Sequence, residues 1–339
     1  MPPATDRPTP LPPAPPALVS SGAPLFGSWS GSLPDTSLDR IEAPYATGLA
    51  RKLREKKWVY LLTSTPEAFL CLGIVDAGYL HSGFCAVFDR QSRRLLCDTS
   101  PVLPPVCASV SDDAAAGPFA RLVGPGVRAS FVREGASVRV SADLGGASFS
   151  LVLDPSTALP PLSVCAPIAA GRFDFTQKSV WLTARGEVRA AGKTFRFDGA
   201  PAGLDFTHGH LARRTAWRWA FGMGLCAGKR VAFNCSEGFL GPAGPENVIW
   251  VDGTPALLGP VTFSFDPKDR SAHWFVRGGG LELDFTPEGA RTMDTDVLGL
   301  ITSRYVQPFG RFRGHLTTPE GERLPVELDG VTEDHTAVW

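Results

Sequence analysis

Titratable and aromatic side chains are densest in the segment DFTHGHLARRTAWRW, residues 205–219. His208 and His210 are two residues apart, which on a strand turns both imidazoles to one side. Imidazoles transfer protons near neutral pH, and the same spacing occurs in metal sites. A metal would need a further ligand from elsewhere, such as Glu246, His273 or Asp205, and no second motif supplies one. We therefore expect acid–base chemistry, hydrogen bonding or a structural role in a loop, with no metal and no cofactor.

The second half of the segment alternates like a strand and places Trp217 and Trp219 on one face. Two neighbouring indoles form a broad apolar surface, which suits a flat or polyunsaturated ligand or stabilises a cation through the ring faces. Core filling is the competing interpretation, because tryptophan is large and buries well. The two histidines precede the pair in a Gly-containing stretch that reads as a loop. We expect these imidazoles and indoles to meet in one sheltered apolar cavity.

Further polar groups could contribute to such a cavity. Glu246 would have a raised pKa inside a barrel, as a general acid requires, whereas at a loop end it would only satisfy backbone groups. Tyr79, which lies near Asp76 and His81, is expected either to transfer protons or to be a turn residue of a β-hairpin with no chemical role. The other candidates are amides and C-terminal residues, namely Asn234, Asn247, Gln307, Gly310, His315, Glu333, His335 and Trp339.

The elements that must position these residues are short strands. The chain contains 36 glycines and 31 prolines, which leave little room for long helices. Turn signals recur about every ten residues between alternating apolar and polar positions, as in a meander of antiparallel strands. The one helical spacing, near residues 38–57, is interrupted by Pro44 and Gly48. These patterns predict an all-β protein with two antiparallel β-barrels or sandwiches in tandem and few short helices.

Composition divides the chain into three parts. Residues 1–22 are rich in proline and are predicted to form a disordered, solvated tail. The Pro-rich segment DPSTALPPLSVCAP suggests a domain boundary. We therefore predict an N-terminal barrel over residues 23–172 and a C-terminal barrel over residues 173–339.

Charge and motif content count against several classes of protein. Lys and Arg total 33 against 34 Asp and Glu, so the surface lacks the positive excess of nucleic-acid-binding proteins. No run of 18 apolar residues predicts a membrane span, and the N-terminus lacks the pattern of a secretory signal. Seven cysteines at wide spacings fit reduced thiols in the cytoplasm. Nucleotide-binding loops and the Gly-x-Ser-x-Gly elbow are absent, which counts against nucleotide chemistry and common serine hydrolysis.

The segments GHLARRTAWRWA, NCSEGF and QPFG, with DAGY, WVY and the pair Glu246–Asn247, resemble the bacterial family of domain of unknown function 2804. The resemblance runs from about residue 22 to the C-terminus, and the Trp-Arg-Trp block is its most specific part. That family has no assigned activity. More distantly, the doubled meander is similar to the tandem lipocalin-like superfamily of the AttH proteins and carotenoid 1,2-hydratases. This likeness implies two lipocalin-like barrels and apolar ligands such as isoprenoids or polyketides.

Together these observations favour a cytoplasmic protein that binds a hydrophobic small molecule. The first hypothesis adds hydration, isomerisation or cyclisation by a cofactor-independent hydratase, lyase or isomerase, because a water-poor cavity strengthens proton donors. The second is a non-catalytic lipid or isoprenoid carrier, and the third is a carbohydrate-active β protein with a carboxylate pair. Proton transfer is assigned to His208, His210, Asp205 and Glu246, and ligand binding to Trp217, Trp219, Tyr79, Asn234, Asn247 and Gln307.

Overall fold

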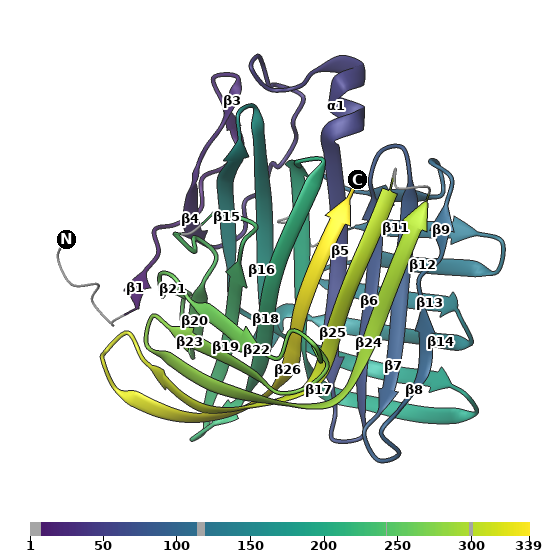
Figure 1. The fold of residues 1–339 in the computed structure, drawn as a ribbon, viewed down its shortest axis with the longest axis vertical. Helices are drawn as coiled ribbons and strands as arrows, with labels where there is room; N and C mark the ends of the chain where they lie inside the picture. Colours follow the sequence, from purple (N-terminus) through teal and green to yellow (C-terminus); the bar gives the residue numbers. More distant parts are fainter. Residues whose placement is uncertain (1–7, 114–118, 242, 298–300) are drawn as a thin grey trace. The chain divides into compact units, whose positions relative to one another are not determined.

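Antiparallel strands dominate the structure, which confirms the all-β prediction (Figure 1). The computed structural model describes residues 8–113, 119–241, 243–297 and 301–339. Within these residues the one α-helix is α1 (Gly48–Arg54), and a 3-10 helix covers Pro155–Thr157. The predicted helical stretch near residues 38–57 is thus shortened at both ends. Gly48 begins the helix, and Glu55 already has extended backbone angles and continues as a strand.

Two compact units divide the chain. The N-terminal unit comprises residues 14–27 and 31–212, and the C-terminal unit comprises the described residues of 1–13, 28–30 and 213–339. The border therefore falls after Ala212 and not near residue 172. The Pro-rich segment is no linker, because it forms a strand whose neighbour, residues 172–190, continues the N-terminal sheet. Its prolines are tolerated at strand positions that need no backbone donor.

The N-terminal unit is built on one long, curled antiparallel sheet. Its strands follow the order β10-β11-β12-β13-β14-β16-β17-β5-β6-β7-β8, with β15 beside β16 and β9 beside β7. The strands of this sheet within the unit are β5 (Glu55–Ser64), β6 (Ala68–Asp76), β7 (His81–Asp89), β8 (Arg94–Thr99), β9 (Val102–Leu103), β10 (Ala108–Val110), β11 (Ala120–Gly124), β12 (Val127–Glu134), β13 (Ser137–Leu144), β14 (Ala147–Asp154), β15 (Leu159–Ala169), β16 (Arg172–Ala190) and β17 (Lys193–His210). Two short strands of the unit, β2 (Val19–Ser20) and β3 (Ala23–Pro24), pair with each other in a separate small sheet.

Alternation along the strands creates the interior of this unit. Phe131, Val140 and Leu151 are direct neighbours on β12, β13 and β14, and all three are fully buried. The intervening side chains face the solvent, where Arg139 forms an exposed ion pair with Glu134. Period-two sequence patterns of this kind predicted the strands correctly, since successive side chains of a strand point to opposite faces.

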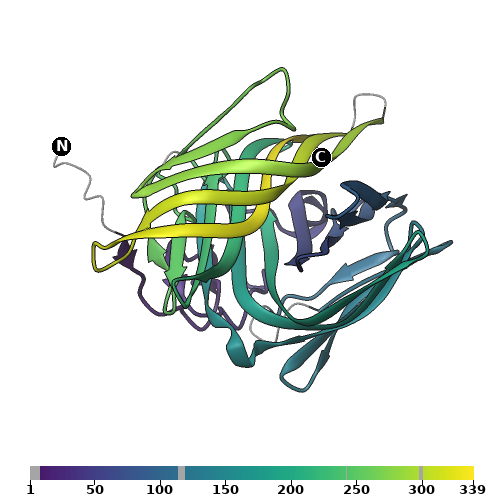
Figure 2. The same ribbon diagram turned by 90° about the horizontal axis from the view of Figure 1, so that it is seen from below.

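The C-terminal unit also has one antiparallel sheet, in the order β1-β21-β20-β19-β18-β26-β25-β24-β23-β22. In Figures 1 and 2 its long strands β24, β25 and β26 run side by side and curve along their length. The strands of the sheet are β1 (Thr9–Pro10), β18 (Arg214–Cys226), β19 (Lys229–Glu237), β20 (Val248–Val251), β21 (Ala256–Leu257), β22 (Thr262–Phe265), β23 (Trp274–Gly278), β24 (Leu281–Val297), β25 (Ile301–Thr317) and β26 (Arg323–Val338). Most of the short strand β4 (Gly27–Ser30) also belongs to this unit.

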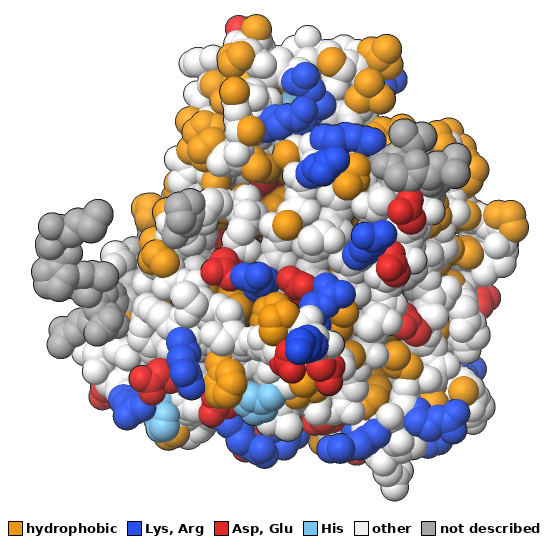
Figure 3. All heavy atoms as spheres, in the orientation of Figure 1, with side chains coloured by type: hydrophobic (Ala, Val, Ile, Leu, Met, Phe, Trp, Pro, Cys, Tyr) orange, Lys and Arg blue, Asp and Glu red, His pale blue; other side chains and the backbone are white. Residues whose placement is uncertain are grey.

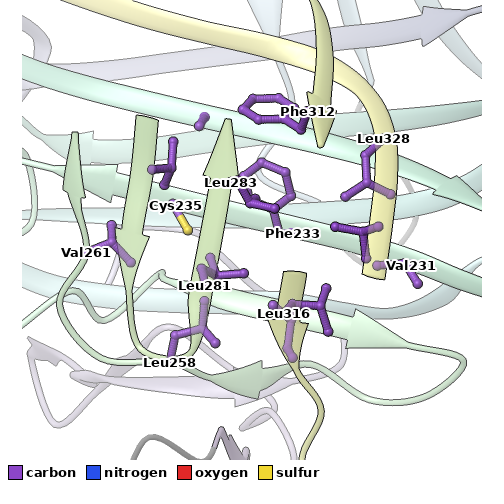
Figure 4. Close-up of a cluster of buried hydrophobic side chains, with 14 of the residues drawn as sticks. Val231, Phe233, Cys235, Leu258, Val261, Leu281, Leu283, Phe312, Leu316 and Leu328 are labelled. Carbon is purple, nitrogen blue, oxygen red and sulfur yellow. The ribbon is translucent and has the colours of Figure 1, made fainter. Parts of the chain in front are cut away.

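A cluster of buried apolar side chains forms the core of the C-terminal unit (Figure 4). Phe312 lies at its centre, with ring centroids 4.8 Å from Phe233 and 4.4 Å from Phe285. All three rings are fully buried, and burying each one contributes roughly 1.5–3 kcal/mol. The core occupies one face of the sheet. The alternate side chains of β18 and β26 therefore point to the opposite face.

Three glycines form a row across the middle of this sheet. Gly222 on β18 and Gly310 on β25 both lie opposite Gly330 on β26. A Cβ atom on Gly330 would lie 2.1 Å from the carbonyl oxygen of Phe221 and 2.9 Å from the Phe312 ring. The row therefore lets the strands approach closely and leaves room for the central phenylalanine of the core.

The Pro-rich N-terminal stretch differs from the predicted tail. Residues 1–7 of that tail lie outside the described residues, but the rest is placed. Thr9 and Pro10 form β1 against β21, and Leu18 and Val19 are buried. Proline is acceptable at the end of a sheet, where its missing donor costs no ladder hydrogen bond.

Acidic and basic side chains lie interspersed over the visible face of Figure 3. Many of them pair, as do Arg311 and Arg313 with Glu327 at 2.8 and 3.0 Å. Pairs of this kind are exposed and contribute little to stability. Among the described residues, no helix is long and apolar enough to cross a membrane.

Candidate functional site

The residues selected from the sequence fall into both units. The N-terminal unit carries Asp205, His208, His210 and Tyr79, and the C-terminal unit carries Trp217, Trp219, Asn234, Glu246, Asn247 and Gln307. The expected meeting of the two histidines with the two tryptophans in one cavity remains a prediction, because the groups belong to different units.

His208 lies on a strand and not in the expected loop. The glycine of the motif, Gly209, sits inside β17, and a Cβ on it would lie 2.5 Å from the carbonyl oxygen of Phe173 on β16. The glycine thus serves close pairing of strands and forms no turn. His208 is fully buried, and its Nε2 atom is 2.7 Å from Oε1 of Glu55 on the neighbouring β5.

Three charged side chains, Glu55, Lys57 and Asp112, lie around this imidazole, and together with His208 they are here called the Glu55 cluster. Lys57 lies 3.3 Å from Glu55 and also pairs with Asp112, whose carboxylate is 3.8 Å from Nδ1 of His208. Burial alone would raise the pKa of Glu55, but His208 and Lys57 hold it well below its usual range. Burial likewise opposes the charge on Lys57, yet the two carboxylates raise the pKa of its amine. The carboxylate of Glu55 and the ammonium of Lys57 are therefore both charged at neutral pH.

His210 is a buried imidazole of a different kind. Its side chain is fully buried against the ring of Phe173, with centroids 5.1 Å apart. Neither ring nitrogen has a hydrogen-bond partner among the described residues. Burial lowers the pKa of His210 to about 4, so the ring is neutral at neutral pH. A neutral, buried base of this kind does not donate a proton in its resting state.

Asp205 and Tyr79 lie apart from the Glu55 cluster. Asp205 points to the opposite face of β17, where its carboxylate is 2.5 Å from the amine of Lys178. Tyr79 lies in the β6–β7 turn, with the amine of Lys56 above its ring at 4.6 Å. In the same turn, the ring of His81 contacts the carboxylate of Asp76, at 3.1 Å. These contacts are sufficient to explain the turn without a ligand.

In the C-terminal unit, Trp219 begins a chain of buried polar contacts. Its indole N–H donates to Oδ1 of Asn234 at 2.8 Å, and the Asn234 amide donates to the backbone oxygen of Glu246 at 2.9 Å. The carboxylate of Glu246 is buried and lies 3.3 Å from the same amide. Asn247 accepts from the Ser236 N–H and donates to a carbonyl oxygen, so its amide orders a loop. Asn234 and Glu246 are therefore linked to the Trp219 indole by buried hydrogen bonds.

Trp217 points toward the strand on the other side, β26, and meets a carboxylate there. Glu333 accepts hydrogen bonds from the Trp217 indole at 2.9 Å and from the Gln307 amide at 2.6 Å. The same carboxylate lies 3.2 Å from Nδ1 of His335, and Nε2 of that ring is 2.9 Å from Oγ of Ser303. We call these five residues the Glu333 cluster.

Strand register explains why the Glu333 cluster assembles. Trp217 on β18 and Tyr305 on β25 both lie opposite His335 on β26. Glu333 is two residues before His335 and therefore shares its face of the strand. The His335 ring lies between the two aromatic rings, 4.1 Å from Trp217 and 5.1 Å from Tyr305 by centroids.

The side chains of the Glu333 cluster are mostly buried but keep some exposure to solvent. The side chains of Glu333 and His335 are 12% and 13% exposed, and Trp217 is half-buried. Gln307 is buried, and its Oε1 atom has no hydrogen-bond partner among the described residues. The cluster therefore offers an imidazole–carboxylate pair, an available acceptor and an aromatic surface within one sheet.

In the sequence, residue type and spacing marked Glu333 and His335 as site candidates less clearly than the histidines of β17. Both were open candidates, and their spacing of two residues already placed them on one face if the segment formed a strand. Their partners, Trp217 and Ser303, lie far away in the sequence. Only the pairing of β18 and β25 with β26 brings these groups together.

Three solved structures share this fold. An AttH-like protein from Nitrosomonas europaea is 15% identical, with a TM-score of 0.55 over 87% of this chain and 96% of that one. Kievitone hydratase from Nectria haematococca is 13% identical, with a TM-score of 0.51 over 98% of each chain. CghA crystallised with Sch210972 is 14% identical, with a TM-score of 0.50 over 84% of this chain and 88% of that one. At these identities the likeness establishes the fold alone.

No curated protein matches the sequence. The model of one protein family does match, over residues 15–339. That range contains most of both compact units and every residue of the Glu55 and Glu333 clusters. The chain belongs to the family described as domain of unknown function 2804.

Proposed function

We propose that the chain binds a hydrophobic small molecule at the Glu333 cluster and transforms it by proton transfer through His335. The observation that carries the proposal is the imidazole–carboxylate pair of His335 and Glu333 held between the rings of Trp217 and Tyr305. The name of one structural neighbour, kievitone hydratase, agrees with this class of ligand. The cytoplasm stays the proposed location, supported by seven thiols that form no disulfide.

The proposed chemistry follows from the hydrogen bonds. With the carboxylate of Glu333 at Nδ1, the His335 ring carries a proton on that nitrogen, and the hydroxyl of Ser303 donates to Nε2. The carboxylate stabilises the imidazolium, so Nε2 can take a proton from the ligand or return one. The indole supplies an apolar surface, and Oε1 of Gln307 is a buried acceptor without a partner among the described residues. Hydration, isomerisation and cyclisation each move a proton, which the imidazole–carboxylate pair supplies.

The first experiment identifies the ligand. Native mass spectrometry of the untagged protein, purified from its own cells, should show a co-purified apolar molecule. Replacing Trp217 by Ala should weaken its binding, whereas His335→Asn and Glu333→Gln should retain binding and lose turnover by about 100-fold or more. The exposed His273 of the same unit supplies the control, because His273→Ala should change neither property. Full turnover in His335→Asn would contradict the proposed mechanism.

A second candidate, acyl transfer, is favoured by one observation. Ser303, His335 and Glu333 form a hydroxyl–imidazole–carboxylate chain with contacts of 2.9 and 3.2 Å, the order of groups in nucleophilic triads. In that reaction Oγ of Ser303 would attack an ester carbonyl, its proton would pass to Nε2 of His335, and the leaving alkoxide would take that proton. A fluorophosphonate probe should then label the wild type and spare Ser303→Ala. An unlabelled wild type would leave proton transfer as the function.

The remaining alternatives predict different results. A carrier needs Trp217 but neither His335 nor Glu333, so it shows binding and no turnover in any assay. A carbohydrate-active site needs two carboxylates about 5–10 Å apart across a groove. The neighbouring Asp334 does not supply the second carboxylate, because it pairs with Arg218 and Arg270 on the opposite side of β26. The acid–base roles expected from the sequence for His208, His210, Asp205 and Glu246 stay predictions, which the corresponding Ala or amide variants would test.

A further inference from the structure

One unusual feature of the N-terminal unit plays no part in the proposed chemistry. His210 is fully buried, and both of its ring nitrogens lack hydrogen-bond partners among the described residues. Nδ1 of the nearby His208, also fully buried, likewise lacks a hydrogen-bond partner there. Buried polar atoms are nearly always satisfied, and leaving one unsatisfied costs about 1–3 kcal/mol. At His208 this buried nitrogen lies 3.8 Å from the carboxylate of Asp112, which indicates that a cation binds between them.

Strand register places carboxylates beside these imidazoles. His208 and His210 share one face of β17, and Glu55 on β5 lies directly opposite His210. Ligand atoms of Glu55, Asp112 and His208 all lie within 4.8 Å of one another. Neutral imidazole nitrogens and carboxylate oxygens are the donors that zinc and related divalent ions take in proteins.

The charges of the cluster also fit a cation. The ammonium of Lys57 contacts both Glu55 and Asp112, so a positive group already lies between the two carboxylates. The two charges of a divalent ion would balance those of the two carboxylates, while Arg51 keeps its contact with the other oxygen of Glu55 at 2.9 Å. The flexible stem of lysine allows its ammonium to leave. Lys57 is therefore a competitor for the position that a metal ion would take.

We propose that His208, Glu55 and Asp112 bind one divalent transition-metal ion, with Lys57 as the competing cation. The ion would hold β17, β5 and the Asp112 segment together. This site is separate from the Glu333 cluster, and it does not depend on the function proposed there. It also revises the expectation from the sequence, because only one of the two histidines, His208, belongs to the group.

Zinc alone is the probe. The untagged full-length chain is treated with a chelator and titrated with zinc by calorimetry, and cobalt is used in parallel because its visible absorption reports the ligand geometry. We expect one equivalent to bind. His208→Ala and Asp112→Asn should each weaken zinc binding by about 100-fold or more. Lys57→Met should tighten binding by about tenfold, since removing the competing ammonium needs to contribute only about 1.4 kcal/mol for that change.

The variants also distinguish zinc bound at this site from zinc bound elsewhere on the chain. His273→Ala removes an exposed histidine and should bind zinc like the wild type. Circular dichroism of each variant shows whether it folds, and Lys57→Met keeps the test valid if the His208 and Asp112 variants do not. Zinc binding that both of these variants retain would overturn the proposal. Binding by Lys57→Met but not by the wild type would also overturn it, because lysine would then be the permanent cation of the native chain.

Discussion

Replacing Gly330 by alanine tests the close approach of β18, β26 and β25. The new Cβ would lie 2.1 Å from the carbonyl oxygen of Phe221, 2.8 Å from Cα of Gly222 and 2.9 Å from the Phe312 ring. Two of these obstacles are backbone atoms, so no side chain can simply turn away. Relief requires the strands to separate by roughly 1 Å, and overpacking costs about 1–3 kcal/mol even where side chains can adjust. We expect Gly330→Ala to destabilise the C-terminal unit by about 3 kcal/mol or more.

Urea unfolding measures this effect, together with hydrogen exchange that reports each unit separately. The chain has two units and need not unfold in one step, so exchange in β18 and β26 is the more specific readout. Gly253→Ala is the matched control, because its new Cβ would have its nearest contact at 3.6 Å, with the carbonyl oxygen of Val251. That control should change stability by less than about 1 kcal/mol. Equal unfolding of Gly330→Ala and the wild type would refute the steric argument.

Two further predictions concern charged pairs of the N-terminal unit. Asp89 is buried, and its hydrogen bond from Lys193 lowers its pKa to about 2 from an ordinary value of 3.8. Its stabilisation, roughly 1–2 kcal/mol after allowing for the half-exposed lysine, is present above about pH 4 and is lost as the pH falls toward about 2. Acid titrations of stability should show this step in the wild type and not in Asp89→Asn. Lys178→Met should cost about 3 kcal/mol, because it leaves the carboxylate of Asp205 without its ion pair. The double variant with Asp205→Leu should recover part of that loss in urea unfolding, and an equal loss in both would contradict a coupled pair.

The fold was accessible from the sequence because its main signal is local. Alternation of apolar and polar residues identified strands such as those of Phe131 and Val140, and it placed Trp217 on a strand face. The family resemblance pointed to the same architecture. Proline and glycine were less reliable guides. The Pro-rich segment near residue 160 forms a strand, and Gly209 serves strand pairing, because the need for close contact with a distant strand leaves no local trace.

The candidate sites depend on pairings that no local pattern contains. His208 and His210 were selected for their spacing, but their partner Glu55 becomes visible only through the register of β17 with β5. Glu333 and His335 likewise acquire Trp217 and a serine hydroxyl through β18 and β25. Residue type and spacing therefore identified possible ligands and acids, whereas strand register decided which of them lie together.

The pairing of β1 with β21 constrains how the C-terminal unit is made. Thr9 and Pro10 complete an edge that otherwise ends at Ala256 and Leu257, and the ribosome must synthesise the chain as far as these residues before that edge can close. Until then β1 has no partner strand, although the N-terminal unit has already been synthesised. Such long-range contacts slow folding, because the loop between them must close before the contacts form. A recombinant fragment that begins at Arg213 would expose the edge of β21 and should be prone to self-association.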